Sequence, residues 1–292
     1  MTQVTVGPPW SADGPIPVAP PHNLLSLPGI LVPDTGDEHW LVGVEAWPYP
    51  RDLPSTVDPC SEGTFRVKAE GEGWNLPIFG PFTAYLPITC SAITAKSAGF
   101  ADRARLAFQA KEHWAVSHEL AWGTAQPLNP FLADGNTQIL AGGAAVTPDV
   151  GLSYLEDAIG QTGIGGVIHT TNAVAAAWNG SSGGYGVEDS GGTLYTTANE
   201  TPVAVSGAYR GATPRFGAEA GAGQQWVFAS SPIQVRRQND IQVIADSIAQ
   251  SMDRQQNDVT FRAERGYVVT YDAPESNSDT RPVQAAVLID WA

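Results

Sequence analysis

The sequence is poor in charge, and above all in positive charge. Charged residues make up 15% of the 292 residues, and 30 acids against 15 bases give a net charge of −15. Only Lys68, Lys96 and Lys111 are lysines. Because Lys and Arg supply the charge that neutralises phosphates, this balance argues against a protein that grips nucleic acid. A protein that encloses nucleic acid without binding it specifically is compatible with the same balance.

Cysteine and long apolar runs are also scarce. The two cysteines, Cys60 and Cys90, have a spacing that fits no zinc motif. The sequence allows a disulfide between them, but two cysteines do not make a secreted disulfide scaffold, so we expect free thiols. The N-terminus lacks the basic and apolar regions of a signal peptide, and no window approaches 18 apolar residues. We therefore expect neither a signal peptide nor a membrane span.

Motifs that carry catalysis are missing as well. His113 and His118 lie five residues apart, which is about 140° around a helix, so they cannot bind one metal ion from the same face. The serines of the Gly/Ser-rich loop at residues 180–192 are better explained as part of a linker than as a nucleophile on a strained turn. The glycines around Gly165 precede a short apolar run instead of separating a strand from a helix, so they do not form a phosphate loop. We predict no catalytic residue, no metal site and no cofactor.

The chain is instead rich in apolar side chains, tryptophan, glycine and proline. Hydrophobic residues make up 42%, with 9 Trp, 31 Gly and 23 Pro. A low charge combined with many aromatic residues suggests that much of the surface is buried against partners. The proline-rich start, residues 1–37, excludes a regular helix and predicts an extended arm.

The segment Phe100–Trp122 is the longest unbroken helical pattern in the sequence and contains no Gly or Pro. It predicts one helix of about 34 Å, which we call the spine helix. Trp114 lies at the middle of a wide apolar arc, with Gln109 and Glu112 on the opposite side. Leu106 adds apolar character to that opposite side, so we expect the helix to be covered on more than one side.

Further elements follow from local signals. Thr147, Pro148 and Asp149 predict a helix start, with the helix running to Gly160. A second short helix is expected over residues 173–179, capped by Thr171 and Asn172 and closed by Gly180. The expected strands are 38–47, 64–70, 74–85, 165–170, 193–197, 203–209, 225–229, 233–237, 259–271 and 283–291. A further strand and a short helix are expected within residues 241–255.

The order of these parts resembles the major capsid proteins of tailed phages. Three stretches support the likeness to those of actinobacterial phages: Gly165–Thr171, Trp226–Arg236, and the ending from Asn257 to Trp291. That family has the Hong Kong 97-type shell fold, which encapsulins share. The resemblance implies an α+β fold and no catalysis. It implies that copies of the chain assemble as hexamers and pentamers into an icosahedral shell.

The resemblance also implies a division of the chain. Residues 1–37 form the N-terminal arm, 38–92 an extended loop, 93–146 the peripheral domain with the spine helix, 147–232 an axial domain, and 233–292 strands that return to the peripheral domain. The candidate assembly residues are Phe65, Lys68 and Trp74 in the loop, and Leu106 and Trp114 on the spine helix.

The implied setting is the virion, assembled in the host cytoplasm. The chain would enclose DNA without binding it specifically, contact other virion proteins, and avoid membranes. Two other functions stay open, namely another structural virion protein (tail, connector or decoration) and a soluble enzyme. A shell protein would elute as very large particles and an enzyme as a small oligomer.

Overall fold

A computed structural model describes residues 17–32, 36, 38–46, 78–91, 100–180, 188–189, 195–245, 252–253, 258–273 and 283–292. The fold is mixed α+β, as predicted. Its helices are α2 (Phe100–Trp122), α3 (Pro148–Thr162) and α4 (Asn172–Gly180), with short 3-10 turns η1 (Leu24–Ser26), η2 (Glu38–Val42), η3 (Leu140–Gly143) and η4 (Gly207–Tyr209). Two larger sheets and two small two-stranded ones, β1–β2 and β6–β7, complete the described part.

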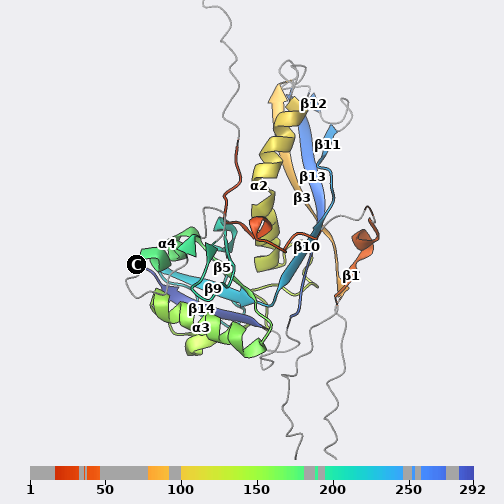
Figure 1. The fold of residues 1–292 in the computed structure, drawn as a ribbon. Coiled ribbons are helices and arrows are strands. Elements are labelled where there is room, and N and C mark those ends of the chain that lie inside the picture. Colours follow the sequence, from red (N-terminus) through yellow and green to blue (C-terminus); the bar gives the residue numbers. More distant parts are fainter. Residues whose placement is uncertain are drawn as a thin grey trace, which may run out of the picture.

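The first sheet is built around one long strand, β13 (Asp258–Tyr271). On one side β13 pairs along ten residues with antiparallel β3 (Phe82–Ser91). Its other partners are β10 (Ile233–Arg237), β11 (Gln242–Ala245) and β12 (Met252–Asp253). Figure 1 shows α2 lying along this sheet in the upper half of the molecule.

The second sheet has the order β4-β14-β9-β5-β8 and lies in the lower half of Figure 1, with α3 and α4 beside it. Its strands are β4 (Gln138–Ile139), β14 (Gln284–Asp290), β9 (Gln224–Ser230), β5 (Val167–Thr170) and β8 (Val203–Val205). The small sheets contain β1 (Val44–Glu45), β2 (Ile78–Phe79), β6 (Glu188–Asp189) and β7 (Tyr195–Thr196).

Both faces of the second sheet are buried. Successive residues of a strand point to opposite faces, so neighbouring residues of β9 and of β14 belong to different core clusters. Val227 and Val287 pack with α3 and α4 in one core cluster. Their neighbours Trp226, Phe228 and Leu288 belong to the other cluster, which includes α2 and the first sheet. This explains why β5 and β9 read as continuous apolar runs.

The predicted spine helix matches α2 from its first residue to its last. It ends at Gly123, which has a φ of 58° and donates its N–H to the Glu119 carbonyl. The α3 start is also as predicted, although the Thr147 side chain makes no capping hydrogen bond, and the helix continues to Thr162 before the left-handed Gly163.

Three predictions need correction. One strand was expected over residues 38–47, but the described part of this stretch, residues 38–46, forms the turn η2 and the two-residue β1. Within residues 203–209 the chain leaves the strand at Val205 and forms η4. The segment 233–292 does not act as one set of strands, because β14 pairs with β9 in the second sheet, whereas β10 to β13 lie in the first.

The N-terminal arm also differs from its prediction. Residues 21–30 contain the 3-10 turn η1, capped by the Asn23 side chain. Leu24, Leu27 and Ile30 are buried in the first core cluster. This part of the arm therefore belongs to the subunit core. The predicted strand 64–70, residue Cys60 and the side chain of Cys90 lie outside the described residues.

Candidate assembly surface

The exposed side of α2 carries a ladder of stacked rings. The Trp114 and His118 rings have centroids 4.9 Å apart, and those of His118 and Trp122 are 5.8 Å apart. The three residues are spaced by four positions, which places them on one face of a helix. Trp114 remains 48% exposed and Trp122 37% exposed. Exposed indole surface of this extent favours contact with another protein surface.

The ladder is held in place and carries little charge. The Trp122 indole Nε1 donates a hydrogen bond to the Ala208 carbonyl at 3.2 Å, which fixes the end of the ladder. Partial burial lowers the pKa of His118, while the nearby Glu119 carboxylate acts in the opposite direction. His118 is therefore mainly neutral at pH 7, so the three rings form one largely uncharged surface.

A hollow of about 440 Å³ lies next to the ladder, between β3 and α2. Tyr85 and Leu86 contribute from the strand, and Phe108, Trp114 and Ala115 from the helix. The walls are largely apolar, and Lys111, Glu112 and His113 also line the hollow, so its charged groups are of both signs.

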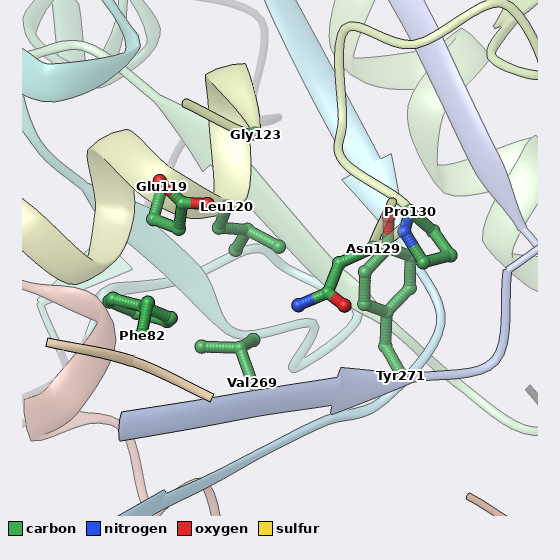
Figure 2. A pocket seen from close by; sticks show the side chains of 8 residues that line it. All are labelled: Phe82, Glu119, Leu120, Gly123, Asn129, Pro130, Val269 and Tyr271. Atoms are coloured by element: carbon green, nitrogen blue, oxygen red, sulfur yellow. The ribbon is translucent and has the colours of Figure 1, made fainter. Parts of the chain in front are cut away.

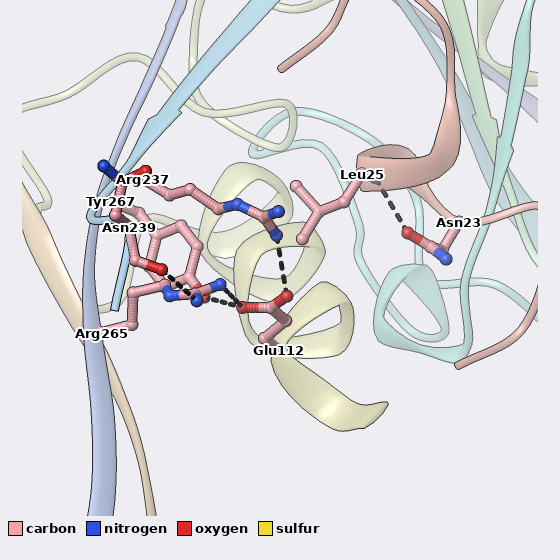
Figure 3. Close-up of polar contacts among 7 residues, drawn as sticks. All are labelled: Asn23, Leu25, Glu112, Arg237, Asn239, Arg265 and Tyr267. Atoms are coloured by element: carbon pink, nitrogen blue, oxygen red, sulfur yellow. Dashed lines mark hydrogen bonds and ion pairs between the residues drawn. The ribbon is translucent and has the colours of Figure 1, made fainter. Parts of the chain in front are cut away.

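The position of α2 against the sheet depends on a buried carboxylate. Glu112 is only 5% exposed, and its two carboxylate oxygens accept hydrogen bonds from Arg237 at 2.9 Å and from Arg265 at 2.8 Å. The Tyr267 hydroxyl donates to the same carboxylate, and Arg265 also donates to the Asn239 carbonyl at 2.8 Å. Figure 3 shows the guanidinium groups and the Tyr267 ring converging on Glu112. These contacts join α2 to β10 and β13.

This cluster also determines how Tyr267 titrates. Burial raises the pKa of the Tyr267 hydroxyl well above its usual range, and the adjacent Glu112 carboxylate raises it further. The hydroxyl therefore remains a hydrogen-bond donor at any pH at which the protein is folded. The cluster is a structural anchor, because its charges are paired with one another and face inward.

A second acid holds the turn that follows α2. The Glu119 carboxylate accepts hydrogen bonds from the backbone N–H groups of Ala125 and Gln126 and from the Thr124 hydroxyl. The Asn129 side chain then forms two hydrogen bonds with the backbone of Gly80, at 2.8 and 2.9 Å. The hollow in Figure 2, between these groups and the β13 side chains, has a volume of only about 10 Å³. It is too small for a ligand larger than one water molecule.

The most enzyme-like group of side chains lies in the interior. His169 accepts or donates hydrogen bonds at both ring nitrogens, with the Tyr209 hydroxyl at 3.1 Å and the Ser230 hydroxyl at 2.9 Å. All three side chains are fully buried. Burial lowers the pKa of His169 to about 3. Because no substrate can reach this serine, the arrangement serves to connect β5, η4 and β9.

The five predicted assembly residues have different outcomes. Leu106 and Trp114 both lie on α2 and are both exposed, at 41% and 48%. The middle of the predicted apolar arc, at Trp114, is therefore not the side of α2 that faces the sheet; Glu112 lies on that side and contacts β10 and β13. Phe65, Lys68 and Trp74 lie outside the described residues, so their assignment stays a prediction.

Sequence reasoning missed the roles of Glu112, His118 and Tyr85. Glu112 was assigned to the opposite side of the helix from the apolar arc, yet it is buried. The available signal was the basic pair Arg236–Arg237 late in the chain, because a buried acid needs such a partner. His118 could have been recognised from its spacing of four residues to a tryptophan on each side.

Other kinds of site are not evident in the described ranges. There, no group of three or more His, Cys, Asp or Glu side chains is arranged to hold a metal ion. In the same ranges, no helix is both long and apolar enough to cross a bilayer.

No protein-family model matches the sequence, and no curated protein matches it either. Solved structures do match in fold. The capsid of an empty GTA particle aligns with a TM-score of 0.57 at 12% identity, covering 98% of this chain and 96% of that one. A chain from Microbacterium phage Oxtober96 aligns with a TM-score of 0.56 at 12% identity, covering 98% and 95%. One from Mycobacterium phage Bobi gives 0.55 at 13% identity, covering 99% and 97%. Over nearly its whole length, the chain has the fold of a phage-type capsid protein, as the sequence resemblance predicted.

Proposed function

We propose that this chain is a major capsid protein that assembles into the icosahedral head shell of a phage. In this proposal its partners are copies of itself, arranged as hexamers and pentamers, together with other virion proteins. The shell forms in the host cytoplasm and encloses the phage genome. The predicted arm, extended loop, peripheral domain and axial domain then describe how each copy is divided.

The observation that carries the proposal is the match of nearly the complete chain to the capsid of an empty GTA particle. A match that covers both chains almost completely includes the connections as well as the sheets. The fold by itself does not fix a function. The second support is therefore the exposed apolar surface of α2, which a stable monomer would not need.

The charge balance agrees with a container. A net charge of −15 repels DNA at short range. Such a wall would enclose the genome without holding particular sequences. The side chains of His169 and Ser230 are fully buried, so a substrate cannot reach this histidine and serine, and they give no support to an enzymatic function.

The test is to express the chain alone and examine it by size-exclusion chromatography and negative-stain electron microscopy. We expect closed particles of uniform diameter. A discrete small oligomer would contradict the proposal and would favour a tail, connector or decoration protein, or an enzyme.

A pair of variants tests the α2 surface. Leu106→Asp places a charge on an exposed apolar residue, so the subunit should fold while the particle yield falls. The side chain of Leu106 is 41% exposed, so we expect no loss of folding yield. Gln109→Asp, which adds the same charge to an exposed polar residue on the same helix, is the control. Equal particle yields from wild type and Leu106→Asp would show that Leu106 is not part of the interface between copies.

A further inference from the structure

The described start of the chain is bonded through its main chain to both larger sheets. The His22 carbonyl accepts a hydrogen bond at 2.8 Å from the N–H of Val205, which ends β8. Eight residues later, the Ile30 carbonyl accepts one at 2.8 Å from the N–H of Val235 in β10, whose carbonyl accepts from the Val32 N–H at 3.0 Å. β8 is the last strand of the second sheet, and β10 belongs to the first. One short segment therefore joins the two sheets.

We call residues 21–32 the strap, and its side chains fill the space between the sheets. Leu24, Leu27 and Ile30 recur at every third position and are at most 4% exposed. They belong to the core cluster that α2, the first sheet and one face of the second sheet share. The turn η1 contacts both α2 and β8. Figure 1 shows the strap, in red, where the two sheets meet.

Local features hold the strap in its conformation. The Asn23 side chain accepts a hydrogen bond at 2.9 Å from the Leu25 N–H, which caps η1 and is drawn in Figure 3. Pro28 and Gly29 form the turn that follows, and Gly29 has a φ of 75°, as glycine has at the third position of a type II turn. A Cβ at Gly29 would meet no atom within 4 Å. This glycine is therefore required by its backbone conformation and not by close packing.

A short connection also joins the two sheets at some distance from the strap. β9 ends at Ser230 and β10 begins at Ile233, so two residues link the sheets there. From Ser230 the strand register leads across β5 to Val205, two strands away and three residues along. At about 4.8 Å per strand and 3.3 Å per residue, Val205 lies roughly 14 Å from the link. The strap therefore restrains the second sheet at the end of a long lever arm.

This lever arm makes the strap sensitive to the angle between the sheets. A rotation of about 5° about the link, in the direction that carries β8 away from the strap, moves Val205 by about 1.2 Å at this radius. The bond from the Val205 N–H to the His22 carbonyl would then lengthen from 2.8 Å to beyond about 3.5 Å and break. Apolar packing between the sheets, in contrast, has no preferred direction. The hydrogen bonds of the strap therefore limit the angle more narrowly than apolar packing alone.

We propose that the strap sets the angle between the two sheets of each subunit, and that the Asn23 cap and the left-handed turn at Gly29 hold the strap in place. In a shell, this angle tilts one half of the subunit against the other, so it determines how strongly a layer of copies curves. A uniform angle then gives particles of one diameter. Control of the angle is a property of the subunit, whereas its effect on the diameter rests on the proposed shell function.

Two substitutions of Gly29 test what holds the strap. Gly29→Ala adds a Cβ that disfavours the left-handed conformation, whereas Gly29→Asn adds a side chain that tolerates it. In full-length subunits, the Val205 and Val235 amides should exchange hydrogen about tenfold faster in Gly29→Ala than in wild type. In Gly29→Asn they should stay within about twofold of wild type. Unchanged exchange at both amides in Gly29→Ala would contradict the role of this turn.

Distances between two spin labels test the angle itself. In full-length chains with Cys60→Ser and Cys90→Ser, nitroxides are attached at Thr83→Cys in β3 and Gln161→Cys in α3, both exposed positions. Electron–electron double resonance should give a narrow distribution of distances with the strap intact. In Gly29→Ala the distribution should be about twofold broader, because a second arrangement of the sheets becomes populated. Equal widths despite faster amide exchange would refute control of the angle by the strap.

Electron microscopy tests the consequence for the shell. Gly29→Ala particles should vary in diameter or stay open, whereas Gly29→Asn particles should match those of wild type. Uniform Gly29→Ala particles of wild-type diameter, together with a broadened label distance, would show that the angle does not determine the curvature. If wild type forms no particles, the shell function fails, while amide exchange and label distances still decide whether the strap sets the angle.

Discussion

The buried carboxylate of Glu112 offers the sharpest test of how the spine helix is held. Glu112→Gln keeps the size of the side chain and removes its charge. Arg265, with a side chain only 8% exposed, would then lose its ionic partner. Removing one partner of a buried ion pair typically costs about 3–5 kcal/mol. Arg237 is 34% exposed and can turn to water, so we expect the loss to come mainly from Arg265 and to total about 3–4 kcal/mol.

The assay is equilibrium urea unfolding followed by far-UV circular dichroism, at two protein concentrations so that any contribution of association is visible. Asp102→Asn breaks the exposed pair with Arg105 and should change the free energy of unfolding by less than about 0.5 kcal/mol. The double variant Glu112→Gln/Arg265→Met removes both charges and should recover part of the loss. A loss below about 1 kcal/mol for Glu112→Gln, at an unchanged m-value, would refute the anchoring role.

Three further predictions follow from burial. Trp114→Ala should lower the free energy of unfolding in urea by only about 1 kcal/mol, because the ring is half exposed. Electron microscopy should show fewer particles of this variant than of wild type. A decrease in the free energy of unfolding above about 3 kcal/mol would mean that the ring is buried in the subunit. Deleting residues 1–35 removes three core side chains and should give insoluble protein, whereas deleting residues 1–16 should preserve the circular dichroism spectrum and impair assembly; soluble, folded protein from the longer deletion would contradict the arm's place in the core. Below pH 6.5 the unfolded chain binds a proton at His169, whereas in the folded chain the pKa of this histidine is about 3. The free energy of unfolding should therefore fall as the pH drops from 6.5 toward 3, by up to about 4 kcal/mol. A His169→Gln variant with the same pH dependence as wild type would show that this histidine is not responsible.

The sequence predicted elements well wherever the signal was local. The ends of α2 followed from a run without Gly or Pro, and β10 and β13 from β-branched and aromatic residues between turns. The start of α3 followed from Pro148 at the first helical position. These signals depend on the chain's own backbone preferences, and the tertiary structure agrees with them.

The choice of which helix face is buried could not be read from the pattern. Along α2, Ala104 and Phe108 are buried in the first half, whereas Val116 and Leu120 are buried in the second. The covered side therefore changes along the helix, because different strands and turns contact each half. A prediction from one apolar arc assumes that the same side is buried along the whole helix. It therefore put Trp114 on the apolar side and Glu112 on the opposite side.

The sequence pattern also does not predict which distant strands pair with one another. Nothing local in Gln284–Asp290 distinguishes a partner for β13 from a partner for β9, since both would accept an apolar strand. The exclusion of catalytic motifs, by contrast, rested on spacing alone. The assembly surface could be predicted only as far as the helix that carries it.

The central position of β14 has a consequence for how copies are made. Incoming β14 completes the sheet between β4 and β9, and each of its faces fills a different core. A nascent chain that stops before this strand has a gap in the middle of the sheet and two open cores. Such a chain cannot settle into a partly native subunit, so folding is delayed until β14 has been synthesised.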